Sequence, residues 1–331
     1  MINVTNIGSA TRYLEKVIDM ILSVSRRTDI PAFFAKWFIN RIRAGYVLVR
    51  NPMNYHQVSR INLSPKTLDC IVFWTKNARP ILPYLDEIGA SYPFYFQYTL
   101  NAYERDIEQN LPPLKEKIET FQTLSNKIGR EKVIWRYDPI LLSNEYDIER
   151  HIKNFDNLAQ TLSPYVESCV FSFFDAYPKV MKNIKACNVR ACNNEEMNYL
   201  AKELAFIAQR NNLKLKTCAE IIDLQAYGIE HGKCIDPELI SRIIGCNIDA
   251  AKDKNQRSEC GCVESIDIGQ YNTCRHGCKY CYANFNAQSV ETFNLQHNDE
   301  SPLLIGELSE VDKVTDRKIK SLKTSRQISL F

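Results

Sequence analysis

The chain has 331 residues, of which 45% are hydrophobic and 24% are charged, as in an ordinary globular protein with a sizeable core. Its net charge of +3 argues neither for nor against a polyanionic partner. No apolar run approaches the length of a membrane span. Twelve cysteines without a visible secretory leader do not suit a small secreted disulfide scaffold. We therefore expect a cytoplasmic protein that keeps its clustered cysteines for metal.

Short β-branched and aromatic runs alternate with longer segments of helical periodicity along most of the chain. This rhythm predicts repeated βα units around a parallel sheet. Because the strands are nearly continuous apolar runs, which suits burial on both faces, we expect an α/β fold of the TIM-like (β/α) barrel type. We predict strands at 21–25, 46–50, 70–75, 94–99, 132–137, 169–174, 213–218 and 265–271, and helices at 107–128, 146–162, 195–211 and 282–293.

The domain organisation follows from changes in composition. Residues 1–19 differ from the rest and precede the strand-like run after Met20, so we treat them as an N-terminal extension. Residues 20–298 are expected to form a single barrel domain, which includes a cysteine-rich metal-binding region at 218–284. The character of the sequence changes again after Asn298, so residues 299–331 are expected to form a C-terminal tail.

Three cysteines in a short loop, Cys274, Cys278 and Cys281, have the spacing C-x3-C-x2-C. A four-iron–four-sulfur cluster normally takes four thiolates, so three local ones leave one iron open to a substrate or cofactor. The alternative is a structural zinc site, which needs four ligands and usually has two C-x2-C pairs. The loop has one such pair, which favours the cluster.

With Tyr280 before the third cysteine and Tyr282-Ala283 after it, this loop resembles the signature of radical S-adenosylmethionine (SAM) enzymes, and most closely that of the spore photoproduct lyase type. The resemblance implies that the open iron binds SAM, which is cleaved reductively to a 5'-deoxyadenosyl radical. It also implies a reductant such as flavodoxin or ferredoxin, lyase or transferase chemistry, and contact of Tyr280 with the cofactor. From about residue 20 onward, the chain also resembles a bacterial domain-of-unknown-function family whose members end in this loop.

The position of the loop departs from that superfamily, where it follows the first strand of the barrel. Here the strand and loop lie near the C-terminus. The first and last strands of a closed barrel are neighbours, so we expect a circularly permuted radical SAM barrel. No Gly-Gly-Glu element for the SAM amino group occurs in the chain.

Polar residues follow most of the predicted strands, and in α/β barrels chemistry gathers at these carboxyl ends. Arginines there could bind the carboxylate of SAM or a phosphate group, while Asp138 and Asp175 could bind ribose hydroxyls or pair with the arginines. The alternative is that these residues are helix caps and internal ion pairs. The predicted catalytic residues are Arg26, Asp29, Lys76, Arg136 and Asp138, and the predicted cofactor-binding residues are Tyr280, Arg50 and Asp175.

A second set of cysteines lies upstream of the loop. Cys260-Gly-Cys262, together with Cys218 and Cys234, could form a four-thiolate site for either a second iron–sulfur cluster or a structural zinc. The alternative is that some of these cysteines are small buried hydrophobic residues.

The chain ends in Gln327-Ile-Ser-Leu330-Phe331, which resembles the peptide that docks on the bacterial replication sliding clamp. Such docking would place the protein near DNA, and nucleic acid is therefore a candidate partner. The alternative is an apolar C-terminus that packs on the barrel. We expect radical SAM chemistry on an unknown substrate, with nucleic-acid repair or modification as the candidate class. The competing hypothesis is a non-catalytic zinc or iron–sulfur module recruited to DNA by the tail.

Overall fold

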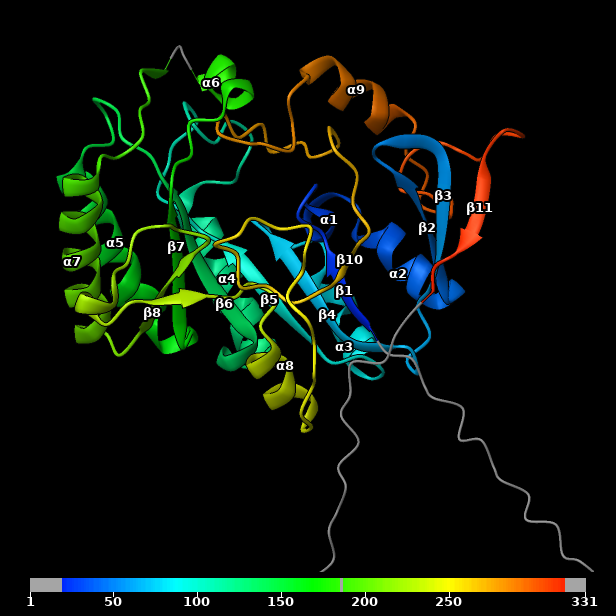
Figure 1. Ribbon diagram of the computed structural model, residues 1–331, viewed down its shortest axis with the longest axis horizontal. Helices are drawn as coiled ribbons and strands as arrows, with labels where there is room; N and C mark the ends of the chain where they lie inside the picture. The colour runs from blue at the N-terminus through cyan, green and yellow to red at the C-terminus, as the bar shows by residue number, and fades with distance from the viewer. Residues whose placement is uncertain (1–19, 185–186, 319–331) are drawn as a thin grey trace, which may run out of the picture.

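The centre of the molecule is a sheet of eight parallel strands (Figure 1) in the order β10-β1-β4-β5-β6-β7-β8-β9. The computed structural model describes residues 20–184 and 187–318. The strands are β1 (Met20–Val24), β4 (Leu68–Thr75), β5 (Phe94–Thr99), β6 (Val133–Ile140), β7 (Ser168–Phe173), β8 (Lys214–Cys218), β9 (Glu230–Gly232) and β10 (Ile266–Asp267). The prediction of a parallel sheet built from βα units is confirmed.

The closed barrel that we expected is not shown. In the described residues, strand pairing runs from β10 at one end to β9 at the other, and no pairing joins these two strands. The late strand β10 pairs with β1, with Leu22 opposite Ile266 and Ser23 opposite Asp267. The cysteine loop after β10 is thereby placed beside the first described strand of the sheet.

A small second sheet lies to one side. In it β2 (Tyr46–Asn51) is antiparallel to β3 (Asn54–Asn62), and β11 (Lys313–Asp316) is parallel to β3. Our assignment of residues 46–50 to the central sheet was therefore wrong. Two residues connect β2 to β3, and such a short connection permits a hairpin but not the crossover that a parallel neighbour needs.

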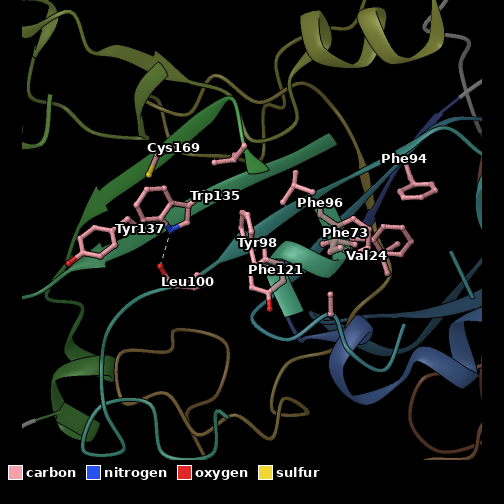
Figure 2. Close-up of a cluster of buried hydrophobic side chains, with 14 of the residues drawn as sticks. Val24, Phe73, Phe94, Phe96, Tyr98, Leu100, Phe121, Trp135, Tyr137 and Cys169 are labelled. Atoms are coloured by element: carbon pink, nitrogen blue, oxygen red, sulfur yellow. Dashed lines mark hydrogen bonds between the residues drawn. The ribbon is translucent and has the colours of Figure 1, made fainter. Parts of the chain in front are cut away.

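One face of the central sheet packs on helices through aromatic side chains (Figure 2). Trp135 of β6 stacks on Phe155 with ring centroids 5.1 Å apart. Its Nε1 donates to the carbonyl of Leu100 at 2.9 Å, as Figure 2 shows. Tyr98 of β5 packs on Phe121. We call this the helix-covered face. Its helices are α2 (Ala35–Ala44), α4 (Leu114–Ile128), α5 (Ile148–Leu162) and α7 (Asn194–Arg210).

The side chains of the alternate residues in each strand point to the opposite face, because successive residues of a strand project to opposite sides of the sheet. Cys70, Val72, Tyr95 and Ile134 pack there against residues 234–263. We call this the loop-covered face, since that segment contains one helix, α8 (Pro237–Ile244), and otherwise irregular chain. Burial of the sheet on both faces accounts for its apolar strands.

Two of the predicted helices begin later in the chain than expected. The predicted helix 107–128 begins only at Leu114, because Pro113 acts as its N-cap and residues 107–110 instead contact the cysteine loop. The predicted helix 282–293 begins at Ala287, where Asn286 caps it. Four further helices are short or lie at the ends of strands: α1 (Ile30–Phe33), α3 (Leu85–Gly89), α6 (Pro178–Ile184) and α9 (Ala287–Leu295).

The folded part continues past residue 298, where we expected the tail to start. Trp37 Nε1 donates to the carbonyls of Ser301 at 2.9 Å and Leu303 at 3.1 Å. Leu303, Leu304 and Ile305 are buried, and β11 follows. The predicted N-terminal extension, 1–19, and the predicted clamp peptide, 327–331, lie outside the described residues.

Candidate functional site

The cysteine loop leaves the carboxyl edge of the central sheet directly after β10. Ile268 N donates to the carbonyl of Ser23 at 3.2 Å, so the loop starts against β1. A Cβ at Gly269 would lie 2.0 Å from Ser25 Oγ, and only glycine permits so close an approach. Asn272 N bonds the carbonyl of Ala283 at 2.9 Å, and Asn272 Oδ1 accepts from Phe285 N. Both ends of the loop are therefore tied together.

The three thiols of the loop interact with one another. Burial raises the pKa of Cys274, Cys278 and Cys281, and the neighbouring sulfurs add to this effect for Cys274 and Cys278. Cys281 N donates to the carbonyl of Cys278 in a tight turn. Within the described ranges, no three His, Cys, Asp or Glu side chains are arranged to hold a single metal ion. The loop thus gathers three protonated thiols without the geometry of a one-ion site.

A buried ionic network supports the loop from β4 and α4. Lys76 Nζ lies 2.9 Å from Glu108 Oε1 and donates to the Tyr280 hydroxyl at 2.7 Å. Glu108 also pairs with Lys117 at 3.2 Å, and Tyr280 donates to Glu108 at 2.5 Å. Burial opposes ionisation of Glu108, but Lys76, Lys117 and the Tyr280 hydrogen bond outweigh it and lower its pKa to about 2. The predicted residues Lys76 and Tyr280 therefore meet, beside Cys278.

Asp29 connects three elements at the same edge. Its carboxylate caps α1 by accepting from Ala32 N, and it also accepts from Thr75 Oγ1 at 2.8 Å and Lys76 N at 2.7 Å. His276 Nε2 of the cysteine loop lies 2.8 Å from the same carboxylate. The predicted catalytic Asp29 is thus a helix cap that also fixes the loop. His276 Nδ1 is buried and has no hydrogen-bond partner.

Arg136 and Asp138 form a pair on the loop-covered side of β6. The guanidinium contacts Asp138 Oδ2 through Nη2 at 2.6 Å and Nε at 3.1 Å, while Nη1 reaches Cys234 Sγ at 2.9 Å. Burial opposes ionisation of Asp138, yet Arg136 and the Ser172 hydroxyl lower its pKa. Asn101 Nδ2 donates to the Asp138 carbonyl at 2.9 Å and to the Tyr280 hydroxyl at 3.4 Å. Asn101 therefore connects this pair to the network around Tyr280.

The other predicted residues are more dispersed. Arg26 N donates to Asp267 at 2.8 Å, and its guanidinium lies over Trp74, so it borders the loop-covered face. Asp175, after β7, pairs with Arg257 at 2.6 Å. Arg50 lies in the second sheet and is bound by Asp312 at 2.8 Å. Arg50 therefore lies on the hairpin and not on a strand of the central sheet, and its cofactor role stays a prediction.

Two carboxylates that lie near predicted residues were not themselves among the predicted site residues. Glu108 was overlooked because it lies in a stretch that reads as the start of a helix; the pair Pro112-Pro113 was the available signal that the helix begins later. Glu220 follows β8 and accepts from Phe173 N at 2.8 Å. Burial raises the pKa of Glu220 to about 7. It therefore exchanges its proton near neutral pH, which suits general acid–base chemistry.

The second set of cysteines comes together on the loop-covered face. Cys218 Sγ and Cys234 Sγ are 3.2 Å apart. The side chain of Cys262 lies close enough to those of Cys234 and Cys260 to shift their pKa values. Four residues from three separate segments, which the sequence grouped by residue type alone, are thus neighbours in the structure.

One protein family matches most of the chain. The family model described as a domain of unknown function, DUF1848, matches residues 21–283. The chain belongs to this family. The match extends from β1 through Cys281, so it contains both sets of cysteines and the network of Lys76 and Glu108. A search of curated proteins found no matching relative. Among the described residues, no helix is long and apolar enough to cross a membrane.

Proposed function

We propose that the protein is an iron–sulfur enzyme of the radical SAM type, in which Cys274, Cys278 and Cys281 hold a four-iron–four-sulfur cluster. The observation that carries this proposal is the gathering of three thiols in one tied loop at the carboxyl edge of a parallel sheet. That edge is where α/β folds commonly place their chemistry. When bound, such a cluster supplies one electron to SAM and so starts radical chemistry.

The residues present fit such a cluster. A cluster binds cysteines as thiolates and therefore removes the protons that burial otherwise retains on these three sulfurs. The positive charge of Lys76 opposes the rise in the pKa of Cys278 and so favours the thiolate form that a cluster binds. The set has three thiols and not four, which leaves one iron for another ligand. The three thiols are not arranged around a single metal ion in the described structure, which is compatible with a larger cluster.

The chain's own residues have definable tasks in this proposal. Asp29 and Asn272 fix the loop against β1 and α1. Glu108 holds Lys76 and Tyr280 beside the thiols. The guanidinium of Arg136 is already engaged by Asp138 and Cys234. It therefore positions neighbouring groups and is poorly placed to bind a further carboxylate through two of its nitrogens. Glu220, with its pKa of about 7, is the group best suited to take or release a proton.

Nucleic-acid repair or modification remains our proposed substrate class, and it rests on sequence. The basis is the likeness of the loop to the lyase-type signature and the likeness of Gln327–Phe331 to a clamp-docking peptide. Removing residues 327–331 should abolish binding to the sliding clamp without changing iron content or stability. Clamp binding that survives the deletion would end that part of the proposal. A small reductant such as flavodoxin or ferredoxin is the partner that the chemistry requires.

The deciding experiment is anaerobic reconstitution with iron and sulfide, followed by SAM and dithionite. We expect four irons and four sulfides in the loop, and formation of 5'-deoxyadenosine. The variant with Cys274, Cys278 and Cys281 all changed to alanine should lose this cluster while its circular dichroism spectrum is retained. Cys187→Ala, at a half-exposed cysteine outside the loop, is the matched control. A cluster that forms normally but yields no 5'-deoxyadenosine would refute the SAM assignment.

A further inference from the structure

Four cysteine sulfurs on the loop-covered face form a continuous group apart from the loop of Cys274. Cys218 ends β8, Cys234 precedes α8, and Cys260 and Cys262 lie in the chain that returns toward β10. Cys218 Sγ contacts Cys234 Sγ, Cys262 Sγ accepts from Cys234 N, and Cys260 lies near enough to Cys262 for the two thiols to influence each other's pKa. Three of the four are buried and Cys218 is partly so. We propose that Cys218, Cys234, Cys260 and Cys262 bind one Zn²⁺ ion as a four-thiolate structural site.

The surroundings of these sulfurs are suited to thiolates. Cys262 Sγ accepts hydrogen bonds from two backbone groups, Cys234 N at 3.3 Å and Ile235 N at 3.4 Å. Arg136 Nη1 donates to Cys234 Sγ at 2.9 Å. Four thiolates and one Zn²⁺ carry a net charge of −2, which N–H donors and a guanidinium stabilise. Neutral thiols in a hydrophobic core need none of these donors.

The spacing of Cys218 and Cys234 favours one ion over a cluster. Thiolates that share a single tetrahedral zinc lie about 3.8 Å apart, given Zn–S bonds of about 2.3 Å. Cys218 and Cys234 are at 3.2 Å. Each thiolate of a four-iron cluster binds a different iron, so those sulfurs lie much farther apart. As placed, the described side chains do not surround an ion, and binding moves the closest sulfurs apart by roughly half an ångström.

A bound zinc would stabilise the segment that carries three of these cysteines by linking it to the sheet. Residues 234–263 cover one face of the sheet with a single helix and isolated bridges, one of them between Lys252 and Val263. The direct anchors to the sheet near Cys234 are Tyr95 Oη at 2.6 Å and Gln97 Nε2 at 2.9 Å, both donating to its carbonyl. Long irregular segments are costly to order, and a four-ligand zinc offsets that cost by joining distant segments.

The test uses the full chain with Cys274, Cys278 and Cys281 changed to alanine, so that iron at the loop does not interfere. After reduction and removal of metal, the protein is titrated with Zn²⁺ alone. We expect one zinc per chain and an X-ray absorption spectrum with four sulfur neighbours at about 2.3 Å. This measurement needs no change in the four proposed ligands and so does not depend on whether their variants fold.

Variants then assign the ligands. In the same background, adding Cys260→Ser and Cys262→Ser should lower zinc to less than a tenth of an equivalent and hasten proteolysis within 234–263. Adding Cys246→Ser, in the same segment but outside the group, should leave one equivalent. Absence of zinc binding in the unsubstituted group would overturn the proposal. So would either of two findings in the same variant purified without oxygen and before any reduction: iron with inorganic sulfide in place of zinc, or a Cys218–Cys234 disulfide seen by mass spectrometry after alkylation.

Discussion

The two faces of the central sheet are covered in different ways. The helix-covered face carries amphipathic helices and stacked aromatic rings, such as Trp135 on Phe155. The loop-covered face carries residues 234–263, with polar groups such as Arg136 and Gln97 and cysteines among the apolar side chains. Apolar burial alone can account for the first arrangement. The second buries charge and irregular chain, which are stable only when their polar atoms are paired. The difference indicates that apolar packing holds one face, whereas the other depends on paired polar and charged groups.

The sharpest test of the helix-covered face is Trp135→Ala. The side chain is fully buried, and its removal leaves a cavity between β6 and α5 and an unpaired carbonyl at Leu100. We expect a loss of about 3–5 kcal/mol in the free energy of unfolding, measured by urea denaturation. The loss should be the same with and without added zinc. Phe206→Ala, at an exposed position of α7, should cost far less. A zinc-dependent loss would break the distinction between the two faces.

A second test of that face uses pH. His151 of α5 is buried between the Tyr137 hydroxyl at 2.9 Å and the Leu141 carbonyl at 2.8 Å. Burial lowers its pKa to about 4, against about 6.5 in an unfolded chain. Between these values the unfolded chain binds more protons, so stability falls as the pH falls from about 6.5 to about 4. The expected loss is about 3 kcal/mol.

The matched variant for this prediction is His151→Gln, which cannot titrate. Its stability at neutral pH should be lower than that of the wild type, because a buried ring is lost. Its unfolding free energy should then change much less between pH 6.5 and 4. Equal slopes for the two proteins over that range would show that another group accounts for the acid sensitivity.

The smallest expected effect is on the loop-covered face. Tyr95 Oη donates to the Cys234 carbonyl at 2.6 Å and accepts from Asp236 N at 3.3 Å. Tyr95→Phe leaves Asp236 N without this acceptor, and we expect a loss of about 1–2 kcal/mol. Limited proteolysis should show faster cleavage in residues 234–263, and zinc should suppress it. Tyr199→Phe, at a half-exposed tyrosine of α7, is the control. Cleavage elsewhere in the chain would argue against a local anchor.

The central sheet could be predicted from sequence because burial on both faces leaves apolar runs such as 70–75 and 94–99. The second sheet was harder to predict, since β3 is largely polar and exposed and its partner β11 is distant in the chain. Barrel closure could not be predicted, because local patterns do not report which edge strands pair. The three cysteines of the loop were recognisable from spacing alone. Glu108 was not, because its importance depends on Lys76 and Lys117, which lie on other elements.

If both sulfur groups bind metal as proposed, the side-chain amide of Asn101 couples the order in which they are filled. It touches Tyr280, beside the loop thiols, and the backbone of Asp138, whose carboxylate holds the arginine that reaches Cys234. Binding equilibria joined in this way obey reciprocity: the factor by which filling one sulfur group changes the affinity of the other is the same in both directions. Replacing Asn101 by leucine would remove the polar contact and make the two affinities more nearly independent. With Asn101 in place, a cell short of zinc would assemble the loop differently from one that is replete, and the substitution would reduce that difference.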